Sequence, residues 1–200
     1  MLAEPEAPWL VHATSFKPWP ACRHCHAAID AALELRDGSQ APIKDVLVSS
    51  YADALDFCDR ATPRTSIEAK FSLQHSVAVA LLEGPPRLAA FDLAALVRPD
   101  VASLRSRIRV TVDQGFAAAY PARFGAAVTV LREDGSVRHA SIPDALGDPE
   151  NPLSEAALQQ KARLLMASAG IDAQQIETII AATLALAEGA PLGALHAALP

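Results

Sequence analysis

The sequence predicts an α+β fold with two layers, a mostly antiparallel sheet with helices on one side of it, followed by a C-terminal helical tail. Three observations lead to this class. Segments with strand-like and helix-like periods are interleaved without a strict repeat, a hairpin closes the strand-containing part, and an alanine-rich, helix-only region follows a proline-rich linker. Strands that include a hairpin, with helices grouped beside them, favour this arrangement over a doubly wound sheet.

The first part of the chain predicts an extended segment, a helix and a strand. Trp9–Phe16 is expected to be extended, and Lys17–Pro20 continues that way because each residue before a proline is pushed out of the α region. Apolar residues at helical spacing predict a helix over Arg23–Arg36. The β-branched residues of Ile43–Ser49 predict a strand, and Tyr51–Ser66 is expected to be an irregular connection.

A buried helix is predicted over Leu73–Glu83, because its residues are apolar nearly all round. Ser72 is its expected N-cap, and Gly84 begins the Gly-Pro-Pro sequence that ends it. Phe91–Leu104 predicts two short helical pieces broken at Pro99.

Three strands are predicted next, over Arg107–Asp113, Ala126–Arg132 and Ser136–Ile142. The turn residues Glu133–Gly135 join the last two into a hairpin.

The composition changes after this hairpin, where Asp148–Pro152 has the composition of a linker. Three alanine-rich helices are predicted beyond it, over Ser154–Ala169, Asp172–Ala187 and Leu192–Leu199. We therefore predict two domains, an α+β domain over residues 1–147 and a helical segment over residues 148–200.

Composition and charge exclude several classes of protein. The chain has 200 residues, 51% of them hydrophobic, so a buried core is expected rather than disorder. Its 17 Lys+Arg against 23 Asp+Glu argue against a nucleic-acid binder or a polybasic membrane anchor. The longest apolar runs are about half the ~20 residues that a bilayer crossing needs. Met1–Pro8 lacks the cationic start of a secretory signal, so we expect a cytoplasmic protein.

The three cysteines, Cys22, Cys25 and Cys58, are expected to be free thiols, because an odd and small number does not suit a disulfide-stapled domain. The spacing Cys22-x-x-Cys25 raises the question of a metal site. Structural zinc needs four ligands, and the other candidates form no second pair, so no metal is expected. A redox role would require a thioredoxin-like setting, which the proline-rich segment before the helix does not provide.

Three potential cations, Arg23, His24 and His26, crowd the first turn of the first predicted helix. The helix macrodipole favours negative charge at that end, so their placement opposes local preference. Such a helix start is a good receptor for carboxylates. The alternative is that these side chains are solvated or bind neighbouring groups.

Two long motifs resemble segments of the MmgE/PrpD family, the family of 2-methylcitrate dehydratase. The sequence FKPWPACRHCHAAIDA of residues 16–31 resembles the family pattern K-P-[YW]-P-x-C-R-x-x-H-x-x-I-D-A, and EAKFSLQHSVAVALLEG of residues 68–84 resembles A-K-F-S-L-x-Y-x-V-A-x-A-L-L-x-G. Gly135 in the hairpin and Asn151–Ser154 at the start of a helix also match. The resemblance covers about Trp9 to Met166, and it identifies the α+β domain as the family's C-terminal lid.

This resemblance implies a cofactor-independent lyase or isomerase acting on small di- or tricarboxylates, as a dehydratase, decarboxylase or epimerase. The family's matching lysine is an active-site residue, so Lys17 is the first candidate to bind a substrate carboxylate or assist proton transfer. Cys22 stands where some relatives carry an active-site histidine, and His75 stands where the usual residue resembles tyrosine; these complete the catalytic candidates.

The substrate-binding candidates implied by the motif are Lys17, Arg23 and His26. Two of the histidines also have structural interpretations. His26 could tie its helix to the sheet, and His75 could be a core histidine whose hydrogen bonds are satisfied internally, which is common beside an apolar helix.

The family's chains are about twice as long and begin with a helical domain that this sequence lacks. The predicted tail resembles the segment that packs on that domain, so its apolar face is expected to bind a partner. We expect a separate protein carrying the N-terminal helical half, or a homo-oligomer, with activity only in the complex. The alternative is a non-catalytic remnant or protein-interaction module that retains the lid fold.

Overall fold

The computed structural model describes residues 9–36, 38 and 41–199. Met1–Pro8, the segment on which the expectation about a secretory signal rests, lies outside them. The chain forms two compact units, Met1–Pro152 and Leu153–Pro200, and each is described by itself. Within the described residues, no helix combines the length and apolar character needed to cross a bilayer.

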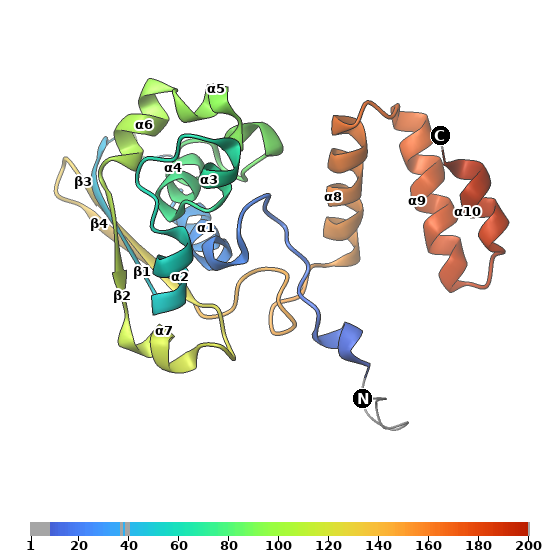
Figure 1. The fold of residues 1–200 in the computed structure, drawn as a ribbon, viewed down its shortest axis with the longest axis horizontal. Helices are drawn as coiled ribbons and strands as arrows, with labels where there is room; N and C mark the ends of the chain where they lie inside the picture. The colour runs from blue at the N-terminus through green and yellow to red at the C-terminus, as the bar shows by residue number, and fades with distance from the viewer. Residues whose placement is uncertain (1–8, 37, 39–40, 200) are drawn as a thin grey trace. The chain divides into compact units, whose positions relative to one another are not determined.

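A four-stranded sheet forms one layer of the first unit (Figure 1). Its strands lie in the order β2-β1-β3-β4, where the bounds are β1 Ile43–Ser50, β2 Ile108–Val112, β3 Ala126–Arg132 and β4 Val137–Ile142. β1 pairs with β2 in parallel, whereas the β1–β3 and β3–β4 pairs are antiparallel. The prediction of a mostly antiparallel sheet is confirmed.

Helices cover one face of this sheet, as predicted. α1 (His26–Glu34) packs against β3 and β4, and α4 (Leu73–Glu83) packs against α1 and β2. The other helices of the unit are short: η1 Leu10–Ala13, η2 Arg23–Cys25, α2 Ala52–Cys58, α3 Ser66–Lys70, η3 Leu88–Phe91, α5 Leu93–Leu96, α6 Pro99–Arg105 and α7 Gln114–Ala119.

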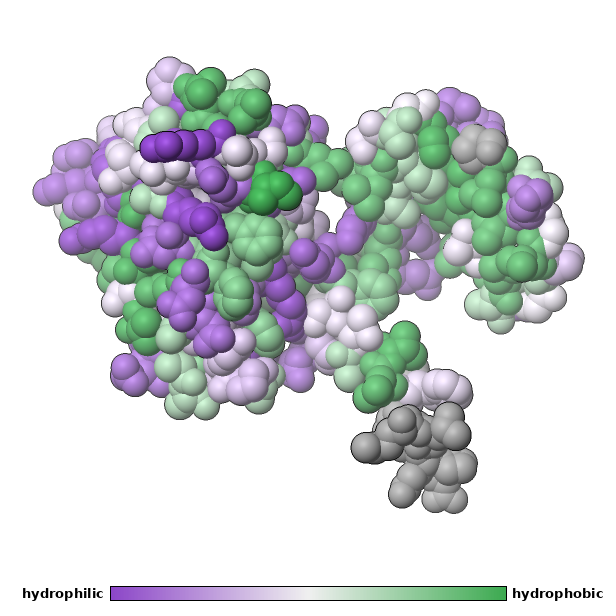
Figure 2. Space-filling model, viewed as in Figure 1, coloured by the Kyte–Doolittle hydropathy of each residue, from purple (hydrophilic) through white to green (hydrophobic). Residues whose placement is uncertain are grey.

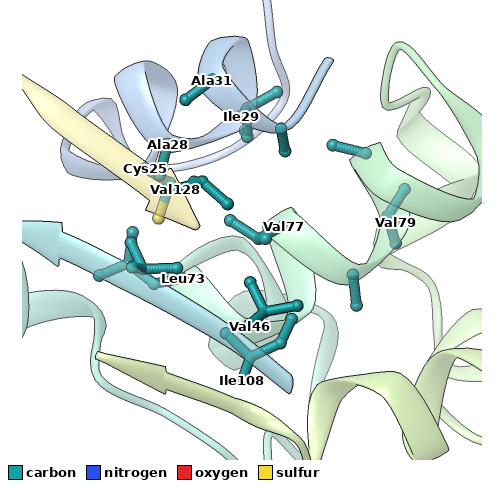
Figure 3. Close-up of a cluster of buried hydrophobic side chains, with 14 of the residues drawn as sticks. Cys25, Ala28, Ile29, Ala31, Val46, Leu73, Val77, Val79, Ile108 and Val128 are labelled. Carbon is teal, nitrogen blue, oxygen red and sulfur yellow. The ribbon is translucent and has the colours of Figure 1, made fainter. Parts of the chain in front are cut away.

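The core lies between the helices and alternate residues of the strands (Figure 3). Val46 of β1 and Val128 of β3 are completely buried, and their neighbours Leu47 and Thr129 point to the opposite face because successive strand residues alternate. Opposite these valines, Val77 of α4 is also fully buried.

α4 follows its sequence signals closely. The Ser72 side chain accepts a hydrogen bond from the backbone N–H of His75 at 3.0 Å, which caps the helix. Gly84 ends it with φ of +93°, a conformation that residues with a Cβ rarely adopt. The all-round apolar character predicted burial, and Leu73–Ala80 is buried throughout.

Three sequence predictions differ from the structure. Trp9–Phe16 is not extended throughout: Leu10–Ala13 forms the 3-10 turn η1, and its backbone bonds locally, with Thr14 N–H donating to the Val11 carbonyl. The connection Tyr51–Ser66, expected to be irregular, contains α2, which packs against η2 and β2. α7 was not predicted, although Asp113 caps it by accepting hydrogen bonds from two backbone N–H groups.

The second unit consists of α8 (Glu155–Ser168), α9 (Ala173–Ala187) and α10 (Leu192–Ala198), within a residue of their predicted bounds. α8 packs against α9, and α9 against α10. No residue of α8 is buried, and large apolar side chains remain exposed on the unit: Leu164, Leu165, Leu184, Leu192 and Leu199. Figure 2 shows hydrophobic residues, in green, over much of the visible face of this unit.

Candidate functional site

The segment that carries Lys17 is fixed on both sides by hydrogen bonds. The backbone N–H of Phe16 donates to the Gly147 carbonyl at 2.8 Å. The Trp19 indole N–H donates to one Asp30 carboxylate oxygen at 2.7 Å, and the backbone N–H of Leu146 donates to the other at 2.8 Å. These bonds tie the proline-rich arm to α1 and to the loop after β4, while Lys17 itself is exposed.

Cys22 lies at the start of η2, where the arm meets the helix. Its backbone N–H donates to the Lys70 carbonyl at 2.7 Å. Contact with the Cys58 thiol and burial raise the pKa of Cys22 far above its ordinary value, against the opposing charge of Lys17. The thiol is therefore protonated at neutral pH, and the Lys17 amine lies within electrostatic range of the helix start.

Cys25 and Cys58 are buried beneath Cys22, and all three thiols are free. The Cys58 thiol interacts with both others. The contact with Cys22 lowers the pKa of Cys58, the contact with Cys25 and burial raise it, and the net shift is upward. Among the described residues, no group of three or more His, Cys, Asp or Glu side chains is arranged to hold a metal ion.

Arg23 joins the helix start to the loop after β4. Its Nη2 donates to the Asp148 carboxylate at 2.5 Å, and the Asp148 side chain is only 5% exposed. The guanidinium also lies over the Phe124 ring, 3.6 Å from the centroid, in a cation–π contact. Within the described part of the chain, its Nε and Nη1 donors have no hydrogen-bond partner.

His24 is surrounded by aromatic side chains from three segments. Its ring stacks on Phe57 at 5.3 Å with an interplanar angle of 4°, and it lies near Tyr120 and Phe124. Its Nδ1 is 2.7 Å from the Tyr51 hydroxyl. Burial lowers the pKa of His24; the Asp53 carboxylate opposes this effect and Arg23 adds to it.

The other two predicted histidines point into the core. His26 is 2% exposed, and its Nε2 donates to the Ala21 carbonyl at 3.3 Å. His75 is completely buried: its Nε2 donates to the Ala90 carbonyl at 2.7 Å, and its Nδ1 accepts from Arg105 at 3.2 Å. The structure thus gives both rings internal partners, and it surrounds His75 with η3 and α6 rather than with the Lys17 arm.

Replacing His75 with phenylalanine is expected to reduce the free energy of unfolding by about 2 kcal/mol, because it leaves the buried Ala90 carbonyl without its donor. Burial and the Arg105 charge lower the pKa of His75. The unfolded chain therefore takes up the proton first, so the stability due to His75 is full above pH 6.5 and is lost as the pH falls below it.

Urea unfolding at pH 7.5 and 5.5 would measure both effects. The pH-dependent loss should be smaller in the His75→Phe variant than in the wild type. His139→Phe, on the exposed face of β4, is the control and should change stability by less than about 0.5 kcal/mol. Equal losses in the two variants would contradict this account.

Lys17 lies close enough to Cys22 to act on it electrostatically, and Cys22 and Arg23 are consecutive residues. The structure adds residues that the sequence did not point to. These are the aromatic partners of His24, and the loop residues that hold the arm and Arg23: Tyr51, Phe57, Tyr120, Phe124, Gly147 and Asp148. Gly147 and Asp148 lie at the predicted linker. A glycine followed by an acidic residue was the sequence signal that could have pointed to them as site residues.

Comparison with protein families matches residues 19–186 to the model of the MmgE/PrpD C-terminal domain. The chain belongs to the MmgE/PrpD family. The match covers most of the α+β unit and continues through α9, and it confirms the family and the C-terminal half that the two motifs predicted. Comparison with individually curated proteins found no match.

Most of the candidate site lies inside the MmgE/PrpD match. Arg23, His24 and Tyr51 are within the matched residues, and Lys17 precedes them by two positions. The arm that carries Lys17 is nevertheless bonded to matched residues, through Trp19, Asp30 and the loop after β4.

Proposed function

We propose that this chain is the lid portion of an MmgE/PrpD-type, cofactor-independent lyase or isomerase that acts on small di- or tricarboxylates. The reactions of this class remove a proton or carbon dioxide next to a carboxylate. They require groups that hold the substrate carboxylates and the negative charge that develops. The proposal includes a partner, either a protein that carries the N-terminal helical half or a second copy of the chain.

The observation that carries the proposal is the fixed position of Lys17 beside the start of η2. The Phe16–Gly147 and Trp19–Asp30 bonds hold the arm on both sides of the lysine. Its charge acts on Cys22, one residue before Arg23. An ammonium group on a rigid segment, with a guanidinium six residues further along the chain, suits a ligand with two or more carboxylates.

The residues have different roles in this proposal. Lys17 binds a substrate carboxylate or assists proton transfer, and the Nε and Nη1 donors of Arg23, which Asp148 does not use, bind a second carboxylate. Cys22 is protonated and neutral, so it contributes a weak hydrogen-bond donor rather than a base. His26 and His75 support the fold around the site through their internal hydrogen bonds.

Replacing Lys17 with methionine is expected to weaken the binding of citrate by tenfold or more, since a charge-assisted hydrogen bond contributes about 1.5–3 kcal/mol. Citrate and succinate would be titrated into the ¹⁵N-labelled chain, and amide shifts should change at the residues other than proline within 16–24. Lys44→Met, an exposed lysine on β1, is the matched control and should bind as the wild type does. Shifts elsewhere only, or unchanged affinity in Lys17→Met, would refute the proposal.

A non-catalytic interaction module is the second candidate, and the surface of the helical unit favours it. Leu164 of α8 is 52% exposed, and Leu192 of α10 is 70% exposed. Exposed apolar surface of this kind is typical of a binding interface. A chain that binds no carboxylate and self-associates through these leucines would favour this function.

A further inference from the structure

The His24 ring is held in place by its neighbours without being closed off from solvent. Phe57, against which it stacks, is 52% exposed, and His24 itself is partly buried. On its other sides lie Tyr51, Tyr120 and Phe124, with ring centroids 5.6, 6.3 and 5.7 Å away. An imidazole confined in this way loses little further freedom on binding a ligand.

The Tyr51 hydroxyl lies 2.7 Å from one nitrogen of His24, Nδ1. Tyr51 is 1% exposed, and its ring stacks on Tyr120 at 4.3 Å. Burial raises the pKa of Tyr51 far above its ordinary value, so the hydroxyl keeps its proton. A buried hydroxyl needs an acceptor, and among the described residues the one within reach is Nδ1 of His24. With Nδ1 accepting, the single proton of a neutral imidazole lies on Nε2.

We propose that Tyr51 holds His24 as the neutral tautomer protonated on Nε2, and that this N–H donates a hydrogen bond to a carboxylate of the substrate. The inference rests on the proposed function and adds His24 to its binding groups. In the described part of the chain, Nε2 has no hydrogen-bond partner, whereas Nδ1 is occupied. The sequence places three potential cations at a helix start, where the helix dipole disfavours positive charge. A neutral His24 reduces this unfavourable interaction, because it carries no positive charge.

The tautomer is tested directly by the imidazole ¹⁵N chemical shifts. Wild-type His24 is expected to give the pattern of a protonated Nε2 and an unprotonated Nδ1 at pH 7.5. Tyr51→Phe removes the hydroxyl and should shift the population towards the other tautomer. A wild-type spectrum with the proton on Nδ1, or a spectrum that Tyr51→Phe leaves unchanged, would overturn the inference.

The role of Nε2 is tested with two substitutions that imitate different nitrogens. The amide nitrogen of His24→Gln can take the place of Nε2, whereas His24→Asn can replace only Nδ1. Citrate affinity should fall about tenfold in His24→Asn, as expected for one hydrogen bond to a charged group, and about threefold or less in His24→Gln. His139→Gln is the control and should bind as the wild type does.

The outcomes separate this inference from the proposed function. If Lys17→Met loses citrate binding and His24→Asn does not, the inference fails and the proposed function stands. If the wild type binds neither citrate nor succinate, the proposed function fails, and the inference with it. Thermal unfolding would show whether each variant is folded. If His24→Asn does not fold, citrate binding by Tyr51→Phe tests the inference instead, and its affinity is expected to fall severalfold.

Discussion

Replacing Arg23 with methionine is expected to lower the free energy of unfolding of the α+β unit by about 3 kcal/mol, because removal of one partner leaves a buried charge uncompensated. The Asp148 carboxylate, whose side chain is 5% exposed, would lose the guanidinium that lies 2.5 Å away. The stacking of Arg23 on Phe124 would be lost as well. Urea unfolding of the full chain at neutral pH would measure the change.

Two further variants show whether loss of the Arg23–Asp148 ion pair causes the decrease in stability. Arg98→Met removes an arginine whose side chain is 43% exposed and paired with Glu83 and Asp100, and it should cost less than about 1 kcal/mol. The double variant Arg23→Met with Asp148→Asn removes the buried charge too, so it should recover more than half of the loss. If Arg23→Met and Arg98→Met have equal effects, or the double variant recovers nothing, the pair does not stabilise the fold as described.

This stabilising role does not compete with the binding role proposed for Arg23, because the two use different atoms. Asp148 accepts from Nη2, and the remaining donors belong to the first residue of η2, next to His24. The ion pair fixes the guanidinium plane, which reduces the entropy lost when a carboxylate binds. Arg23 therefore links the stability of the loop after β4 to the geometry of the proposed site.

Local signals in the sequence were sufficient for most of the fold. The α4 helix carries an N-cap serine, a continuous apolar run and a terminal Gly-Pro-Pro, and each acts within a few residues, so its bounds were predicted correctly. α2 and α7 are only seven and six residues long, too short for a period to be visible. Their formation depends on capping and on packing against neighbours.

The candidate site was predictable only in part, because its contacts are distant in the sequence. Lys17 and Arg23 belong to a motif and were selected from it. Asp148 lies 125 residues from Arg23, and Leu146 lies 116 residues from Asp30, so neither pairing leaves a local pattern. Tyr51 was assigned to an irregular connection, and its bond to His24 follows from where β1 ends in the folded sheet.

Replacing Gly147 with alanine is expected to cost about 3 kcal/mol or more of unfolding free energy and to displace the Lys17 arm, because strain and a steric clash act together. Gly147 has φ of +93°, and an added Cβ would lie 1.9 Å from the Phe16 carbonyl oxygen and 3.2 Å from Cδ of Pro18. No rotation of a side chain relieves a contact with backbone. The Phe16–Gly147 hydrogen bond must lengthen or break, and citrate binding should fall although Lys17 is intact.

Gly135→Ala separates the clash from the strain. Gly135 lies in the hairpin of the same unit with φ of +83°, but an added Cβ there meets no atom within 4 Å. That variant should therefore show only the backbone cost, about 1 kcal/mol, and bind citrate like the wild type. If both glycine variants lose the same stability and both keep citrate affinity, then the close approach of Gly147 to Phe16 does not hold the arm. If citrate affinity falls in Gly147→Ala but not in Gly135→Ala, then binding requires the position of Lys17 as well as its charge.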